Sequence, residues 1–163
     1  MTTQSVLHLA DILLGKGLTV AAAESCTGGL VSDMLTDIPG SSNYFLGSVV
    51  AYSNAVKEHI LGVRASTLFE QGAVSGETAV EMAEGVRHLL GADIAVSITG
   101  IAGPGGGTKE KPVGLTWIGV SSNQGSEASC FHWEGDRRAN KRSSAEQALR
   151  ILLEHVQALP GKD

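Results

Sequence analysis

The order of helix and strand patterns predicts an α/β protein: a three-layer α/β/α sandwich with a mixed β-sheet, in a single domain over residues 1–163. Early in the chain the two patterns alternate, which is typical of parallel strands covered by helices. Two strand patterns then follow one another, which predicts an antiparallel hairpin at the end of the sheet. A chain of 163 residues suits one domain and buries enough surface to fold without disulfides or a structural metal.

The first part of the chain contributes a helix and two strands with a second helix between them. Apolar residues at helical spacing over 6–14 predict the first helix, and Gly15 and Gly17 follow as stop signals. The elements expected next are a buried strand at 18–23, a helix at 30–35, a loop at 39–43 and a strand at 45–53.

The later part supplies the rest of both helical layers. Ser75 is expected to cap a helix that extends to Leu90, with Glu77 near its positive end. The other expected elements are a short polar helix containing Lys57, a connector through Arg64, a strand at 94–99, and hairpin strands at 113–120 and 128–133 joined by 121–126. A closing helix is expected to carry on one face the apolar residues Ala145, Ala148, Leu149, Leu152, Val156 and Leu159.

Composition excludes several classes of protein. The formal net charge of −5 argues against a broad nucleic-acid footprint. Cys26 and Cys130 lack a paired metal or redox spacing, which fits a reducing cytoplasm, and the five histidines form no metal-binding motif. No apolar run approaches the roughly 18 residues of a membrane span, and the first residues do not resemble a secretion signal. We therefore expect a cytoplasmic protein without membrane or nucleic-acid partners and without a metal.

Ser25 lies between a predicted strand and a helix opened by two glycines. In such a turn a hydroxyl can point into a cleft near free backbone amides, which suits a nucleophile. The alternative is that Ser25 and Thr27 only cap the helix. Cys26 is a rival nucleophile, but no histidine lies near it in sequence, so we interpret it as a packed small residue.

Tyr52 and Lys57 lie at either side of the end of the second strand. A lysine that is partly desolvated beside a cleft can lose its proton near neutral pH and act as a base toward a serine. The alternative for Lys57 is a solvated helix lysine. Tyr52 either orients the pair or is an ordinary strand aromatic.

The segment 100–114 is rich in glycine and directly follows an apolar strand. Loops at the carboxyl end of a strand often hold ligands in α/β folds, so a ligand cradle is predicted, with a flexible surface turn as the alternative. Lys109 and Lys111 are candidate cationic contacts. Arg137 begins the last helix, where the helix dipole does not favour a cation, so a ligand or carboxylate partner is expected.

These segments together resemble the CinA C-terminal-domain family, whose stand-alone members are nicotinamide-nucleotide amidases. The resemblance runs in family order from about residue 18 to 149. The matching stretches are 23–29 (AESCTGG), 40–42 with Phe45, 52–54 with Lys57, 72–75 (GAVS), 97–104 (SITGIAGP), 106–108 (GGT), 111–114 (KPVG) and 135–137 (GDR).

The resemblance implies hydrolysis of the carboxamide of nicotinamide mononucleotide without metal or cofactor, in pyridine-nucleotide salvage by a homo-oligomer. It assigns Ser25 as nucleophile, Lys57 as general base and Tyr52 as their support. Lys141 stands where an arginine is expected in relatives, which weakens a phosphate role there. The residues expected to bind substrate are Thr27, Gly28 and Gly29, whose amides are our own oxyanion candidates, and Gly100, Gly103, Gly106, Gly107 and Arg137, which would hold the ribose phosphate.

A second class of function remains open on the sequence. The same pocket would also serve a non-catalytic nucleotide-binding or regulatory module, in keeping with the family's association with competence and DNA damage. Ser25→Ala separates the two classes: in an amidase, the substitution should abolish turnover while ligand binding persists.

Overall fold

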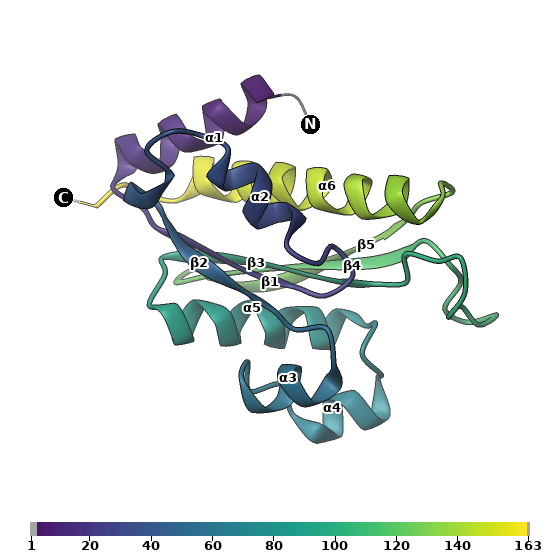
Figure 1. Ribbon diagram of the computed structural model, residues 1–163. Coiled ribbons are helices and arrows are strands. Elements are labelled where there is room, and N and C mark those ends of the chain that lie inside the picture. Colours follow the sequence, from purple (N-terminus) through teal and green to yellow (C-terminus); the bar gives the residue numbers. More distant parts are fainter. Residues whose placement is uncertain (1–2, 163) are drawn as a thin grey trace.

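A five-stranded mixed sheet forms the middle layer of the computed structural model, which describes residues 3–162 (Figure 1). The strand order is β2-β1-β3-β4-β5, with β2, β1 and β3 parallel and the last two antiparallel. The α/β/α sandwich with a mixed sheet is therefore confirmed. The strands are β1 (Val20–Glu24), β2 (Phe45–Val50), β3 (Ile94–Gly100), β4 (Leu115–Ser122) and β5 (Gly125–His132).

Helices cover both faces of the sheet (Figure 1). One face carries α1 (Thr3–Lys16), α2 (Leu30–Thr36) and α6 (Arg137–Ala158); the other carries α5 (Gly76–Leu90), with α3 (Asn54–His59) and α4 (Ala65–Glu70) beyond it. All five residues of β1 are buried because its side chains alternate between the two layers. Val20 and Ala22 pack in the core under α1 and α6, whereas Ala21 and Ala23 pack in the core under α5.

Most boundaries lie near their predicted positions, with four differences. The first helix runs through Gly15 and ends at Lys16, with Gly17 in the left-handed region. β2 ends at Val50 instead of continuing to 53, because Ser53 caps α3 by accepting from the Val56 amide. Residues 41–43 of the expected loop form a 3₁₀ turn, and the hairpin turn is shorter than expected, with Ser122 paired to Gly125.

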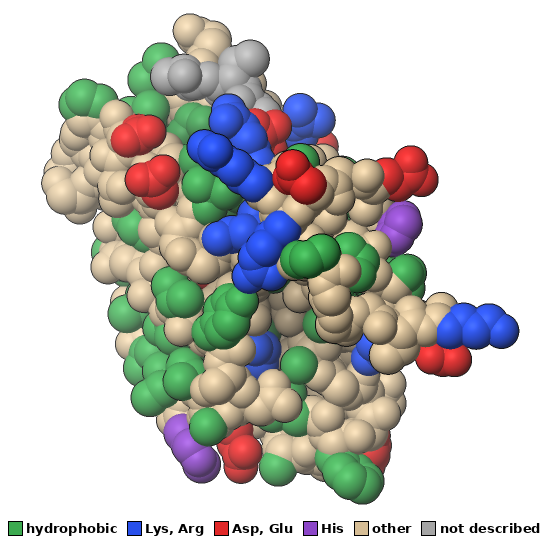
Figure 2. All heavy atoms as spheres, turned by 45° about the vertical axis from the view of Figure 1, so that its right-hand side comes forward, with side chains coloured by type: hydrophobic (Ala, Val, Ile, Leu, Met, Phe, Trp, Pro, Cys, Tyr) green, Lys and Arg blue, Asp and Glu red, His purple; other side chains and the backbone are tan. Residues whose placement is uncertain are grey.

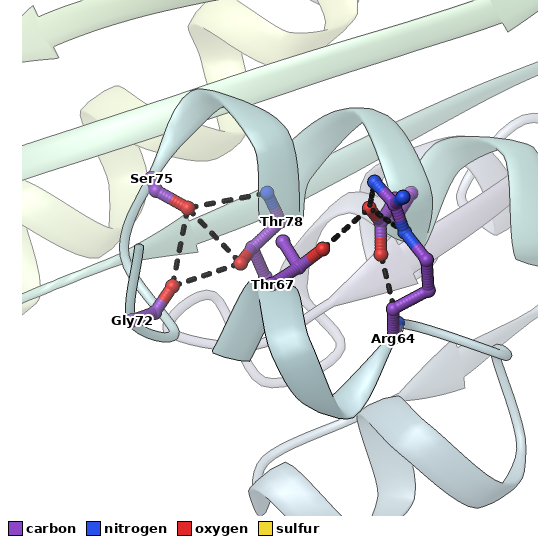
Figure 3. Close-up of polar contacts among 6 residues, drawn as sticks. Arg64, Thr67, Gly72, Ser75 and Thr78 are labelled. Atoms are coloured by element: carbon purple, nitrogen blue, oxygen red, sulfur yellow. Dashed lines mark hydrogen bonds and ion pairs between the residues drawn. The ribbon is translucent and has the colours of Figure 1, made fainter. Parts of the chain in front are cut away.

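The sequence predicts no element for the helix α4, which begins directly after the connector expected through Arg64. It has only six residues, too few for a clear apolar period, and it is stabilised by tertiary contacts. The Glu81 carboxylate on α5 accepts from the Arg64 backbone and guanidinium and from the Thr67 hydroxyl (Figure 3). Ser75 caps α5 as predicted, since its hydroxyl accepts from the Thr78 amide.

A close approach of backbones fixes the segment that follows α3. A Cβ atom on Gly85 would lie 1.9 Å from the carbonyl oxygen of Leu61, so only glycine allows this part of α5 to touch that segment. α3 is thereby positioned below the carboxyl ends of β1 and β2. Because parallel strands end at one edge of a sheet, the segments after β1, β2 and β3 converge there.

None of the helices within residues 3–162 combines the length and apolar character needed to cross a membrane.

Candidate active site

Ser25 and Lys57 meet at this edge of the sheet. The Lys57 Nζ lies 3.0 Å from the Ser25 Oγ and donates to the carbonyl oxygen of Ala51 at 2.8 Å. Ser25 directly follows β1, and Lys57 lies on α3, which follows the neighbouring strand β2. The structure thus brings the two residues into hydrogen-bond contact although they are 32 positions apart in sequence.

Both side chains are withdrawn from water: the lysine is only 2% exposed and the serine 8%. Burial lowers the pKa of the Lys57 amine below its ordinary value of 10.5, because the desolvated ammonium form is disfavoured. The alternative of a solvated helix lysine is therefore wrong. A neutral amine beside a serine hydroxyl is the arrangement needed to accept its proton.

Cys26 is confirmed as a packed small residue. It is 6% exposed and belongs to the core under α6, and burial raises its pKa from 9.0 to about 11. The thiol therefore stays protonated at neutral pH, and the thiolate is the form that acts as a nucleophile. This leaves Ser25 as the candidate nucleophile of the turn.

A cavity of about 280 Å³ opens beside the pair and is referred to below as the serine pocket. It brings together three segments that are distant in sequence: the turn after β1, the start of α3, and the loop after β3. Its lining includes Ser25, Lys57, Tyr52, Thr99 and Arg137. Gly100, Gly103 and Gly106 of the predicted substrate loop also line it.

Tyr52 lies at this pocket but does not bond to the pair. Its side chain is 62% exposed, and its hydroxyl accepts a 3.0 Å hydrogen bond from Arg137 Nη2. Arg137 Nη1 donates to the carbonyl oxygen of Gly103 at 2.7 Å. The arginine therefore links Tyr52 to the glycine loop. These two contacts explain a cation at the start of α6 without a bound ligand.

The turn after Ser25 is held by the carboxylate of Glu24, for which the sequence predicts no role. Glu24 is fully buried and accepts from the amides of Gly29, Val31 and Ser32 and from the Ser32 hydroxyl, at 2.7–3.1 Å. The expectation that Ser25 and Thr27 cap this helix is therefore wrong, since Glu24 takes that place. The sequence signal was a carboxylate at the end of a strand shortly before a helix start.

The same contacts correct the proposed oxyanion site. The Gly29 amide donates to Glu24, and the Gly28 amide donates to the carbonyl oxygen of Ser25. Neither is free to stabilise a developing oxyanion. Of the three amides proposed, only that of Thr27 has no acceptor among the described residues.

We expect Glu24→Gln to destabilise the fold by roughly 2–4 kcal/mol, because the amide nitrogen of glutamine would face backbone donors and leave them unpaired in the interior. Urea unfolding followed by circular dichroism measures this. Glu127→Gln, a change in a largely exposed carboxylate on β5, is the control and should alter stability by about 0.5 kcal/mol or less. A Glu24→Gln protein as stable as wild type would contradict the structural role.

The glycine loop is shaped largely by its own packing. A Cβ atom on Gly103 would lie 2.5 Å from the Val113 side chain, and one on Gly107 would lie 2.7 Å from the Val113 backbone nitrogen. Gly107 is not among the residues that line the serine pocket. At these two positions the close approach that requires glycine is therefore to Val113 of the same loop and not to a ligand.

Other contacts tie this loop to the domain. Lys111 Nζ donates to the carbonyl oxygens of Gln71 and Val74, so it fastens the loop to the segment before α5. The buried Asn140 donates to the carbonyl oxygen of Ala102 and accepts from the Gly135 amide. Lys111, a candidate ligand contact in the sequence, thus has backbone partners in the structure.

Within residues 3–162, no group of three or more His, Cys, Asp or Glu side chains is placed to hold a metal ion.

Fold and site together define a class: an α/β domain with a buried serine–lysine pair at the carboxyl edge of its parallel strands. The model of the CinA C-terminal domain family matches residues 2–156, and the chain belongs to this family.

Named relatives agree with this assignment. A CinA-like protein of Chloroherpeton thalassium is 51% identical over 156 residues, covering 93% of this chain and 37% of the relative. A CinA-like protein of Chlorobaculum tepidum is 53% identical over 150 residues, covering 89% and 36%. The chain thus spans about a third of the length of the curated relatives it matches.

Solved structures match over almost the whole domain. A CinA superfamily protein of Klebsiella pneumoniae has a TM-score of 0.93 at 32% identity and covers 98% of this chain and 100% of its own. A competence/damage inducible protein of Agrobacterium tumefaciens has a TM-score of 0.90 at 38% identity, covering 93% of each chain.

Proposed function

We propose that this protein hydrolyses the carboxamide of nicotinamide mononucleotide, releasing ammonia and nicotinic acid mononucleotide, in pyridine-nucleotide salvage. The observation that carries the proposal is the 3.0 Å contact between the Ser25 hydroxyl and the buried Lys57 amine. Lys57 acts as general base because its lowered pKa increases the fraction of neutral amine at physiological pH. The family resemblance supplies the substrate.

The reaction proceeds through an acyl-enzyme. Lys57 accepts the hydroxyl proton as the Ser25 Oγ bonds to the carboxamide carbon, and the carbonyl oxygen takes the negative charge. Lys57 then passes the proton to the amide nitrogen, the carbon–nitrogen bond breaks, and ammonia leaves. In the second half, Lys57 accepts a proton from water as the water oxygen attacks the ester carbon. The bond from that carbon to the Ser25 Oγ then breaks, and Lys57 returns the proton to the Oγ, which releases the acid and restores the Ser25 hydroxyl.

The surroundings of the pair suit these steps. Ala51 accepts a hydrogen bond from Lys57 and thereby orients the Nζ toward Ser25. The free amide of Thr27 is our candidate for stabilising the oxyanion. Tyr52 supports the site indirectly, because its hydroxyl fixes Arg137 at the edge of the serine pocket. The expected homo-oligomer stays a prediction.

The experiment is a turnover assay of the purified protein with nicotinamide mononucleotide in the presence of EDTA. We expect equimolar ammonia and nicotinic acid mononucleotide, at the same rate with and without chelator. Tight nucleotide binding without turnover would contradict the amidase and favour the regulatory module named above. A rate abolished by EDTA and restored by a divalent cation would contradict the serine–lysine mechanism.

A further inference from the structure

A second, larger cavity of about 690 Å³ lies between the entry to α2 and the start of α6. We call it the cationic pocket. Figure 2, which brings this end of the molecule forward, shows Lys and Arg side chains gathered on the surface. Arg137 lines both this cavity and the serine pocket, so the two adjoin at that residue. The lining consists of Thr27, Gly28, Gly29, Leu30, Asp33, Arg137, Arg138, Lys141 and Arg142.

The lining carries a clear excess of positive charge. Asp33 is the one carboxylate against four cations. Arg142 pairs with Glu146, and Arg137 is held by Gly103 and Tyr52. Arg138 and Lys141 have no salt-bridge partner among the described residues. In a chain whose net charge is −5, two unpaired cations at one cavity indicate a site for an anion.

The buried Thr27 hydroxyl provides a second, independent observation. Thr27 is 1% exposed and lines the cationic pocket, and its Oγ1 has no hydrogen-bond partner. It is one of only two such buried side-chain atoms in residues 3–162. A buried hydroxyl without a partner is costly, and an oxygen-rich ligand would satisfy it.

Lys141 extends across the pocket from α6 toward the turn that carries Thr27. A Cβ atom on Gly28 would lie 3.5 Å from the Lys141 Nζ. Glu24 accepts from the amides of Gly29, Val31 and Ser32, so these three donors at the start of α2 are not available to an anion. The side-chain contacts available to an anion are those of Thr27, Arg138 and Lys141.

We propose that the cationic pocket binds the phosphate monoester of the substrate through Thr27, Arg138 and Lys141. This inference rests on the proposed amidase function and places the carboxamide at Ser25 and the phosphate beyond Arg137. It differs from the expectation that the glycine loop and Arg137 hold the phosphate. It also differs from the sequence-based view of Lys141, because the Nζ reaches the turn beside Gly28 and can contact a phosphate oxygen as a single charged donor. Arg137 already donates to Gly103 and Tyr52, and the Gly103 carbonyl oxygen would repel an anion.

The first test compares nicotinamide mononucleotide with nicotinamide riboside, which lacks the phosphate. We expect Lys141→Met to raise KM for the nucleotide at least about tenfold, with kcat/KM for the riboside unchanged. Thr27→Val should act in the same direction, by several-fold, with no loss of thermal stability, because the hydroxyl has no partner to lose. Arg150→Met, an exposed site on α6 outside the pocket, is the matched control and should change neither substrate.

The second test separates this inference from the amidase. Ribose 5-phosphate is titrated calorimetrically into wild type, Lys141→Met and Arg150→Met. Binding by wild type and Arg150→Met but not by Lys141→Met supports the phosphate site even if no amide is hydrolysed. If wild type hydrolyses the nucleotide but Lys141→Met keeps its KM and its ribose 5-phosphate affinity, the inference is overturned and the phosphate lies at the glycine loop.

Discussion

Replacing Ser25 by alanine should reduce amide hydrolysis by on the order of 10⁴-fold or more while leaving nucleotide affinity within a few-fold of wild type. The mechanism uses the Ser25 hydroxyl, which contacts the Lys57 amine, as its nucleophile, so no acyl-enzyme forms without it. Removing one oxygen from a nearly buried side chain leaves the serine pocket and the cationic pocket otherwise intact. Steady-state ammonia release and calorimetric titration of nicotinamide mononucleotide measure the two quantities.

Cys26→Ala is the matched control, because it alters the neighbouring residue and removes a buried thiol that the mechanism does not use. We expect its kcat/KM to stay within a few-fold of wild type. Residual turnover by Ser25→Ala at more than a few per cent of wild type would contradict covalent catalysis by this serine. A large loss in Cys26→Ala with normal folding would shift the assignment to the thiol.

Replacing Lys57 by methionine, which is similar in length but cannot accept a proton, should lower kcat by about 10³-fold. In wild type, kcat/KM should rise with pH as the Lys57 ammonium loses its proton, and level off once the amine is neutral. The remaining activity of Lys57→Met should lack this rise. A pH–rate profile of both proteins checks the prediction, and an unchanged rising limb in the variant would show that another group is the base.

Lys57→Met should stabilise the fold although it lowers the activity. Because the folded state lowers the pKa of Lys57, it binds fewer protons than the unfolded state, so stability should increase as pH rises from the folded-state pKa toward 10.5. At pH 7 the unfolded chain keeps Lys57 in its favoured ammonium form, whereas burial disfavours that form in the folded state, so this residue costs the fold stability. Lys57→Met should therefore have a higher melting temperature than wild type at pH 7, and the difference should shrink as pH approaches 10.5.

Much of the fold was accessible from sequence because each long element has its own local signal. Apolar periodicity located α5 and α6, and the run of small apolar residues before Ser25 located β1. The pairing of Ser25 with Lys57 came from the family resemblance, because the residues alone left a helix cap and a solvated lysine open. The structure brings the two side chains into contact because they follow neighbouring strands of the sheet.

What sequence missed depends on contacts between distant segments. The helix α4 is held by Glu81 of α5, and nothing local in six residues marks it. The direction of the Tyr52 hydroxyl depends on Arg137, 85 positions away. The cationic pocket combines Thr27 with Lys141, whose proximity arises only when α2 and α6 pack on the same face of the sheet.

The hydrogen bonds from the α2 amides to Glu24 also affect the entropy cost of ligand binding. A turn whose donors are already bonded has its final shape before any substrate arrives, so little conformational entropy is lost there on binding. The ordering cost falls instead on long side chains such as Arg138 and Lys141, which have rotamer freedom to lose. Substrate affinity should then be governed by how firmly these flexible cations become fixed, while the reacting centre behaves as a rigid template.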